Sequence, residues 1–492
     1  MAELDLADFR GGVKHALAST EFSERQWAEL SGVMFGPDGR LEAQWASWQV
    51  DDVADVGRPV AADGWMVGVQ GGLVRSLQLA DDDAEQSGSG LTSHGEAPNG
   101  RTVTTVPAQV DGAWLSAALV NTVEPGEPAR LVYRDPSSGA MTSQMISERY
   151  PPDPETAGLP YGRVAATWGD FLLLGDVRWM ADDGQPLSEE NSTRRSDLVW
   201  FSEPARNDSW DSINVQPVGN ADGENRVVGM FPLDIGLLVT TTSGVYLLRG
   251  NADEYGYEEL RLGIGPQEPE HVCYWPAAGA VVWTDAQGRV WHTNGEQFDR
   301  LDDPLDPAGV PGPVEALHDH LFVGRGDDLW VFRLDGAEGS GAWTRLTSPA
   351  GAGAPEALVA YRTSLYVRAD GGLWRLSAEL GRGAHGGAAA TSRVGTATLA
   401  VSDGHTRAGW HRFGARSTGG GQVVRATARP SPWLAGPGPE LVYDEPLEPD
   451  VRTLRVWPAH GPSLEASFGV EAEGDVSFEG LTVWVHAGKA DR

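Results

Sequence analysis

The sequence contains a single cysteine. Cys273 stands alone among 492 residues, so no intrachain disulfide can form. No set of cysteine and histidine residues has the spacing of the common structural zinc sites, which excludes them. Because Cys273 lies in the apolar run EHVCYW, we interpret it as a small buried core residue.

Positive charge is also scarce. The 37 lysines and arginines are outnumbered by 70 aspartates and glutamates, which gives a net charge of −33 at pH 7. A protein that wraps nucleic acid needs stripes of basic side chains to contact the phosphates, so the composition argues against this function. Two explanations fit the excess of acidic residues. They keep the protein soluble, or they form a surface along which DNA passes without adhering.

Long apolar runs are missing as well. No run of 18 apolar residues occurs, so we expect no membrane span. The stretch MAELDLADFRGGVKH has no basic region followed by an apolar one, so we expect no secretory signal. The phosphate-loop pattern GxxxxGK[ST] and the hydrolase pattern GxSxG are absent, and neither enzyme class finds support in the sequence.

Helical periodicity is rare outside residues 22–31, whereas turn-forming and aromatic residues are abundant. The chain has 63 glycines, 32 prolines and 19 tryptophans, a composition that favours many short strands joined by tight turns. With 40% apolar residues the chain can bury sizeable cores. Its length indicates two or three domains.

One hairpin recurs four times between residues 236 and 377. Each copy has an apolar arm, a polar turn and a second arm in which an aliphatic residue precedes an aromatic one. The first arms align at intervals of 44, 40 and 44 residues on Leu237, Val281, Leu321 and Leu365. The second arms align on Val245-Tyr246, Val290-Trp291, Leu329-Trp330 and Leu373-Trp374. The turns TSG, DAQG, RGDD and ADGG supply residues that tight hairpins require.

A strand repeat of this period predicts a β-propeller, in which four-stranded blades stack around an axis. Looser copies of the hairpin lie upstream, at residues 64–79, 112–135 and 169–204, and the last is split by the polar insert MADDGQPLSEENSTRRS. Seven hairpins predict six to eight blades, with seven favoured. The alternative is two stacked β-sandwiches, which the constant spacing disfavours.

The segments before and after the repeat predict additional structural elements. Residues 1–52 are expected to form an N-terminal strap, a short helix capped by Thr20 or Ser23, and the hairpin VMFGPDGRLEAQW, which would supply the strand that closes the ring. Residues 53–385 are the expected propeller. After GRGAHGGAAA, which reads as a flexible linker, residues 386–492 contain seven or more alternating segments. This strand count predicts a C-terminal β-sandwich or jelly roll.

Two kinds of metal site are suggested by local patterns, and each has a structural alternative. In His318-Asp319-His320, alternation along a strand would place both imidazoles on one face, but no third ligand lies nearby. Residues 80–85 (ADDDAE) and 220–225 (NADGEN) cluster oxygen ligands that suit Ca²⁺, but neither matches a complete calcium-binding loop. We therefore interpret these segments as strand starts and solvated turns, and predict no metal and no cofactor.

Two turns are similar to the aspartate boxes of sialidase-type propellers. In TDAQGRVW, Asp285 stands one position early, and in RADGGLW, Asp370 is next to Gly371. We interpret both as hairpin turns. Because nothing singles out a pair among 70 carboxylates, no glycosidase activity follows, and we predict no catalytic residue.

Large aromatic residues outside the repeat are candidates for contacts with other proteins. They are Phe9, Trp45, Trp48, Trp210 and Trp433. For the tryptophans, packing in the core or between domains is the alternative interpretation.

Most of the chain resembles a group of tailed-bacteriophage virion proteins built on a propeller. The N-terminal segment with DFRGGV, FSERQWAELSGVMF and GPDGRLEAQW is similar to their opening strap and hairpin. Residues 196–250, from SDLVWFSEP to GVYLLRG, resemble their sequence of propeller strands, and GWHRFG resembles the start of their C-terminal part. The chain departs from the pattern after Arg40, where EAQWASWQ replaces the usual basic-glycine pair.

The resemblance implies a structural protein of a phage tail that is not an enzyme. Such proteins form the nozzle below the portal of short-tailed phages, usually as a hexameric ring, or are minor tail proteins of long-tailed phages. The implied partners are the portal or adaptor, the tail tube or a tail fibre, together with further copies of the chain and DNA that passes without specific binding. The implied location is the virion, after synthesis in the host cytoplasm. The alternative is a soluble bacterial propeller that binds or hydrolyses glycans.

Overall fold

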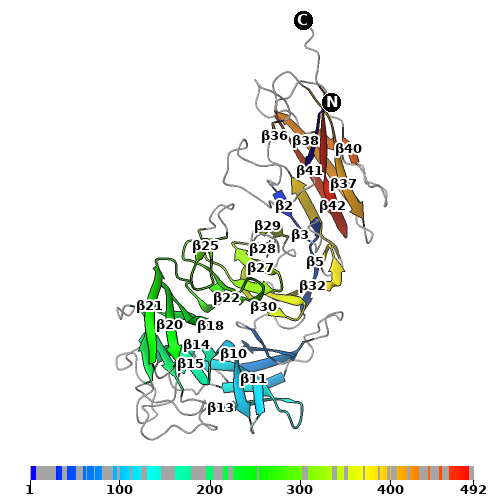
Figure 1. Ribbon diagram of the computed structural model, residues 1–492. Coiled ribbons are helices and arrows are strands. Elements are labelled where there is room, and N and C mark those ends of the chain that lie inside the picture. The colour runs from blue at the N-terminus through cyan, green and yellow to red at the C-terminus, as the bar shows by residue number, and fades with distance from the viewer. Residues whose placement is uncertain are drawn as a thin grey trace.

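The structure is a computed structural model of the chain, drawn in Figure 1. It describes residues 2–6, 29–35, 41–50, 59–62, 64–70, 73–79, 92–96, 100–110, 113–122, 130–145, 161–178, 195–202, 214–219, 225–251, 254–301, 309–334, 341–347, 353–369, 372–385, 388–395, 399–400, 407–417, 422–431, 441–443, 454–456 and 465–486. Within these ranges the regular structure consists of β-strands and two single-turn 3₁₀ helices.

Four successive sheets of four antiparallel strands begin the repeat. The first contains β6 (Val60–Ala62), β7 (Trp65–Gln70), β8 (Leu73–Gln78) and β9 (Thr92–Glu96), and the second β10 (Gly100–Val110), β11 (Ala113–Thr122), β12 (Arg130–Arg134) and β13 (Met141–Met145). The third contains β14 (Tyr161–Trp168), β15 (Phe171–Arg178), β16 (Arg195–Phe201) and β17 (Val215–Pro217), and the fourth β18 (Val227–Leu233), β19 (Gly236–Thr241), β20 (Gly244–Asn251) and β21 (Glu254–Leu262).

Three further sheets complete the repeat. The fifth contains β22 (Val272–Trp275), β23 (Ala280–Thr284), β24 (Val290–Thr293) and β25 (Phe298–Arg300), and the sixth β26 (Val314–Leu317), β27 (His320–Arg325), β28 (Asp328–Leu334) and β29 (Gly341–Leu346). The seventh contains β30 (Pro355–Tyr361), β31 (Ser364–Ala369), β32 (Gly372–Arg382) and, from the N-terminal segment, β5 (Trp45–Val50). All seven hairpins predicted from the sequence form the middle two strands of a blade.

The seven sheets close into a ring. Their first strands contact one another in chain order from β6 to β30, and β30 contacts β6 again. Seven hydrophobic clusters lie between the blades, each combining residues of two neighbouring blades, and two of them also include residues of the N-terminal hairpin or the C-terminal strands. The cluster between blades seven and one joins Leu373 of blade seven to Met66 and Leu77 of blade one. The fold is therefore a seven-bladed propeller, as predicted, and the alternative of two stacked sandwiches is wrong for this part of the chain.

The ring is closed by a strand from the N-terminal side of the chain. β5 pairs antiparallel with β32, with Val50 opposite Leu373 and Ala46 opposite Ser377. The predicted hairpin does form, as β3 (Val33–Phe35) and β4 (Leu41–Ala43), but β4 pairs with the C-terminal strand β42 (Val476–His486). The expectation that the hairpin itself closes the ring is therefore wrong: β5, the strand that follows it, does so.

Other strands near the N-terminus also pair with C-terminal strands. β1 (Ala2–Leu6) pairs with β42, and β2 (Glu29–Ser31) pairs with β35 (Thr391–Gly395). The end of the segment predicted as helical is thus a strand, because its backbone groups are taken up by a neighbouring sheet. Thr20 and Ser23, the predicted caps, lie outside the described residues.

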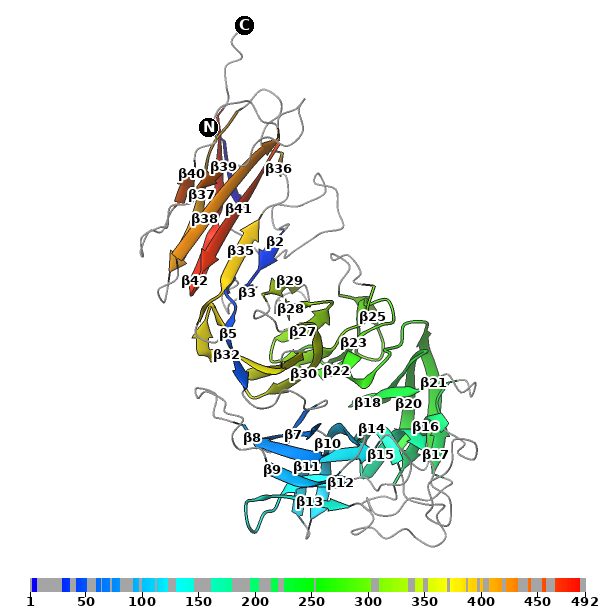
Figure 2. The same cartoon turned by 180° about the vertical axis from the view of Figure 1, so that it is seen from behind.

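The remaining C-terminal strands extend these two groups. β37 (Arg407–Ser417) and β40 (Leu454–Val456) continue the sheet of β42. The sheet of β35 continues through β41 (Glu465–Glu473), β38 (Gln422–Ser431) and β39 (Leu441–Tyr443), with β36 (Leu399–Ala400) also on β41. Figure 2 shows these strands projecting from one edge of the ring. That they form a β-sandwich remains a prediction.

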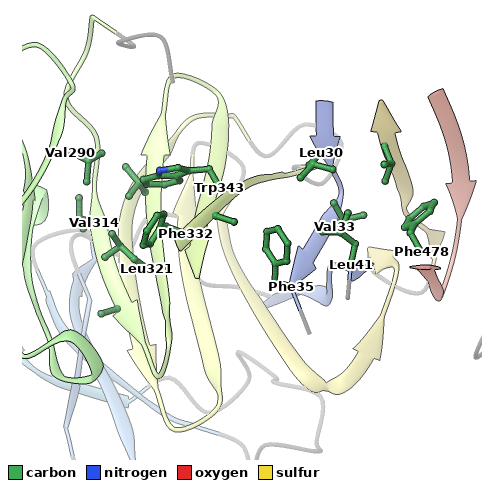
Figure 3. Packing of buried hydrophobic residues seen from close by; sticks show 14 of the residues in the cluster. Leu30, Val33, Phe35, Leu41, Val290, Val314, Leu321, Phe332, Trp343 and Phe478 are labelled. Atoms are coloured by element: carbon green, nitrogen blue, oxygen red, sulfur yellow. The ribbon is translucent and has the colours of Figure 1, made fainter. Parts of the chain in front are cut away.

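The propeller and the C-terminal strands share one sheet and one core. β2 pairs with β29 on one side and β35 on the other, so blade six continues into the C-terminal strands as a ten-stranded sheet. One hydrophobic cluster runs from Leu321 and Trp343 of blade six through Phe35 of the hairpin to Phe478 of β42 (Figure 3). The two parts are therefore packed together.

The segment read as a flexible linker is built into strands. β33 (Ala384–His385) pairs with β34 (Ala388–Ala389) and lies parallel to β5. Gly383 has a φ of 63°, and its Cα approaches the backbone of Gly474 so closely that a Cβ atom would clash. The glycines thus serve a turn and a close approach rather than flexibility, so the linker interpretation is wrong for the described part of this segment.

In the described part of the chain, no helix is long and apolar enough to cross a membrane.

Candidate functional site

Of the aromatic residues predicted to contact other proteins, the structure describes two. Trp45 is 8% exposed and packs inside the chain, with its ring 5.4 Å from the His320 ring and 5.8 Å from the Phe322 ring, measured between centroids. Trp48 is partly buried on the closing strand, opposite Arg375. Phe9, Trp210 and Trp433 lie outside the described residues.

The predicted histidine triplet is a turn rather than a strand. His318 has a φ of 55°, and His320 is the first residue of β27, so alternation along a strand does not bring the two imidazoles together. The carboxylate of Asp319 instead stabilises the turn. It accepts hydrogen bonds from Nδ1 of His320 at 2.7 Å and from Nε of Arg333 at 2.8 Å. These hydrogen bonds lower the pKa of Asp319 far below its ordinary value. Among the described residues, no group of three metal-binding side chains occurs.

The aspartate-box-like segment forms a hairpin turn, as predicted. Asp285 is buried, and its Oδ1 accepts the backbone N–H groups of Gln287 and Arg289 at 2.9 and 3.0 Å. Its Oδ2 accepts Nε of Arg289 and Nε1 of Trp291, at 2.6 and 2.8 Å. All of these donors belong to the hairpin itself, so the carboxylate is committed to the turn.

The remaining sequence candidates have structural roles where they are described. Asn225 is buried, donates to the carbonyl of Val218 and accepts from the Ser243 hydroxyl, which links blades three and four. Residues 80–85, 220–224 and Asp370 lie outside the described residues. Cys273 is buried, as predicted, and burial raises the pKa of its thiol well above the ordinary value, which disfavours the thiolate form.

A polar network that no sequence pattern indicates lies at the edge of the ring. It comprises Gln44, Ser47, Thr347 and His385, which we call the rim junction. Gln44 lies between the hairpin and β5, Ser47 lies on β5, Thr347 follows the last strand of blade six, and His385 is on β33. The rim junction is thus the place where blade six, blade seven, the N-terminal hairpin and the start of the C-terminal strands meet.

The amide of Gln44 is the centre of the network. Its Nε2 donates to the carbonyl of Thr347 at 3.1 Å and lies 3.0 Å from Nε2 of His385. Its Oε1 accepts both the backbone N–H and the hydroxyl of Thr347, at 2.8 and 3.0 Å. Because Oε1 faces two donors, Nε2 of Gln44 must be the donor toward the imidazole.

This arrangement determines the protonation of His385. Since its Nε2 accepts from Gln44, the proton of the neutral ring is on Nδ1, which donates to the Ser47 hydroxyl at 2.5 Å. Burial lowers the pKa of His385, against a smaller opposing effect of a backbone contact with Thr347. The neutral Nδ1–H tautomer therefore satisfies the whole network.

A small pocket borders the rim junction between blades six and seven. Its volume is about 370 Å³ when the open solvent at its mouth is included. Its apolar wall includes Leu329, Leu346, Val367, Trp374 and Leu376, and Ser47, Thr347 and His385 form its polar end. The polar groups at this end bind one another, and Ser47 is fully buried with its hydroxyl on His385.

No protein-family model and no curated protein matches the sequence. Several solved structures are similar at low identity. YCF48 bound to D1 peptide is 10% identical, with a TM-score of 0.42, over 68% of this chain and 97% of that chain. YCF48 from Cyanidioschyzon merolae is 14% identical, with a TM-score of 0.39, over 68% and 100%. Virginiamycin B lyase from Staphylococcus aureus is 11% identical, with a TM-score of 0.38, over 67% and 98%. At these values the similarity concerns the fold alone.

Proposed function

We propose that the protein is a structural component of a bacteriophage tail, of the nozzle or minor tail type, and that it acts by assembly and not by catalysis. Two lines of support lead to this proposal. The first is the resemblance of residues 196–250, and of the N-terminal segment, to propeller proteins of phage tails. The second is the way in which the propeller is joined to the C-terminal strands.

The main structural support for the proposal is the ten-stranded sheet that joins blade six to the C-terminal strands. Blade six, β2 and β35 are held by backbone hydrogen bonds, and the same junction shares a hydrophobic core. A component of a tail must hold its neighbours at fixed positions while force passes through it. A propeller fused in this way to a second module suits that task better than one tethered by a flexible linker.

The proposal includes the organisation that the resemblance implies. The C-terminal strands form a β-sandwich that contacts neighbouring subunits, and several copies, six in the favoured case, make a ring. The partners are the portal or adaptor, the tail tube or a tail fibre. With a net charge of −33, the protein would repel DNA and let it pass without adhering.

Electron microscopy of the purified protein and of phage particles tests the proposal. We expect six-fold rings of the recombinant protein, and labelling of the tail by an antibody raised against it. A monomer that binds saccharides on a glycan array, with no labelling of particles, would favour the alternative of a glycan-binding or glycan-hydrolysing propeller.

A further inference from the structure

The rim junction gathers contacts that hold the edge of the propeller to the chain on both sides of it. Besides the side-chain network, the backbone N–H of Gly383 donates to the carbonyl of Gln44 at 2.8 Å, and that of Gln44 donates to Gly32 at 2.9 Å. Gly32 in turn accepts from the Ser392 hydroxyl at 2.8 Å and donates to Arg345 of blade six at 2.7 Å. One short chain of bonds thus connects blade six, β5 and the first C-terminal strands.

The neutral ring of His385 with its proton on Nδ1 keeps every bond in this chain, whereas a proton on Nε2 does not. A proton on Nε2 would face the amide nitrogen of Gln44 at 3.0 Å, which is itself a donor, and its one acceptor in the network would be the hydroxyl oxygen of Thr347 at the longer distance of 3.3 Å. Rotating the Gln44 amide does not relieve the conflict, because its nitrogen would then face the N–H and hydroxyl of Thr347. Protonation of the imidazole therefore breaks the bond that it accepts from Gln44.

The charged groups around the rim junction do not offset this conflict. Arg382 at the end of β32 pairs with Glu42 of β4, and Arg345 of β29 pairs with Asp328 of β28. The bonds of the imidazole to described residues go to Gln44, Ser47 and Thr347, and none of these is a carboxylate. A protonated His385 would thus be a partly buried cation without a described counter-ion, which is unfavourable.

We propose that the rim junction is a proton-sensitive latch, in which protonation of His385 releases β33 from β5 and from the edge of blade six. The latch is closed at neutral pH, where the ring is neutral. On acidification β33, with its partner β34, separates from Gln44 and Thr347, while the blades and the C-terminal strands keep their shared sheet and core. This inference does not depend on the proposed role in a phage tail.

The direction of the pH dependence follows from linkage. Because the pKa of His385 is lowered in the folded protein, the unfolded or opened form binds the proton more readily. The contribution of His385 to the closed state is complete above its ordinary pKa of 6.5 and is lost as the pH falls below that value toward the folded pKa. In this window the equilibrium shifts toward opening by about tenfold for each pH unit.

Hydrogen exchange of the intact protein at pH 7.5 and pH 5.0, corrected for the intrinsic pH dependence of exchange, tests the latch. The reporters are the N–H groups of Thr347 and Gly383, and the reference is the N–H of Thr242, which binds Arg226 in blade four at 2.9 Å. We expect a severalfold loss of protection at the reporters on acidification, and little change at the reference. Equal loss at all three sites, or none at the reporters, would overturn the latch.

Three variants make the test specific to His385. His385→Asn keeps a donor for Ser47 but does not titrate, so its reporters should respond little to pH. His94→Asn is the matched control, because burial also lowers the pKa of His94, which bonds to Ser76 in blade one, and this variant should keep the wild-type response. Gln44→Glu supplies a carboxylate to the imidazolium and should reduce or reverse the response. A wild-type response in His385→Asn, or in Gln44→Glu if His385→Asn does not fold, contradicts the proposal.

Discussion

Asp285 illustrates how a single buried carboxylate organises a hairpin of the propeller. Its two oxygens accept four hydrogen bonds, two from the backbone of the turn and two from the side chains of Arg289 and Trp291. The side chain is almost fully buried, so water cannot replace these bonds when the carboxylate is lost. The turn and the indole would both be left with unsatisfied donors.

Asp285→Ala is therefore expected to lower the free energy of unfolding by about 2–3 kcal/mol, because hydrogen bonds to a buried charged group are lost together. Urea unfolding followed by tryptophan fluorescence measures the change. Asp135→Ala is the matched control: Asp135 accepts the N–H of Ser137 in a similar turn, but it is exposed, so its loss should cost clearly less. Equal costs would contradict the role of burial.

Some of this residue-level detail could be read from the sequence. The spacing of Asp285 and Trp291 predicted a turn, and the aliphatic residues of the first arms, such as Leu237 and Leu365, are fully buried as the repeat implied. His385 could not be found in this way. Its partners Gln44 and Thr347 lie 341 and 38 residues away in the sequence, and its own segment reads as a glycine-rich linker.

The closing strand β5 is the element on which the ring depends. It supplies the outer strand of blade seven, and Val50 joins the cluster between blade seven and blade one. Ala46 and Ser377 are buried and lie opposite each other on β5 and β32. A disulfide between these two positions would link β5 covalently to β32, where the ring closes.

The double variant Ala46→Cys/Ser377→Cys is expected to form a disulfide, since directly paired strand residues lie at a suitable separation. Oxidation should raise the free energy of unfolding by about 2–4 kcal/mol, because it closes a long loop in the unfolded chain. Thermal unfolding with and without dithiothreitol measures the effect. If the two cysteines remain reduced in the folded protein, or if oxidation leaves the midpoint unchanged, the assignment of β5 as the closing strand is wrong.

At the level of elements, the sequence predicted the middle strands of every blade but not the strands at their edges. The middle strands are buried on both faces and therefore carry dense apolar patterns, as in β19 and β23. Edge strands such as β17 and β25 have only three residues each and are partly exposed, so they carry little pattern. β5 was overlooked as the closing strand because its partner is more than 300 positions away, and local sequence does not specify distant pairing.

The whole molecule is held together by the cluster that joins blades five and six to the C-terminal strands. Phe478 of β42 is 1% exposed and lies on the C-terminal side of this cluster, whereas Phe332 and Trp343 lie on the propeller side (Figure 3). Since the two sides share a core, we expect these blades and the C-terminal strands to unfold together at neutral pH.

Phe478→Ala is expected to cost about 3–5 kcal/mol, from lost burial and the cavity left behind. Because the cavity lies at the boundary, differential scanning calorimetry should resolve an earlier transition of the C-terminal strands. Leu237→Ala is the control: Leu237 is equally buried, but in the cluster between blades three and four, so this variant should lower the main transition without dividing it. A single transition in both variants would show that the boundary is not a separate cooperative unit.

The pairing of β5 with β32 in blade seven has a consequence for the synthesis of the protein. β5 leaves the ribosome early in synthesis, but β32 follows it more than 300 residues later. Until then six finished blades form an arc whose two ends expose apolar surface, and β1 likewise has to wait for β42. The ring therefore cannot close before β32 has been synthesised. Until then, a chaperone that shields the two apolar ends would protect the arc from aggregation.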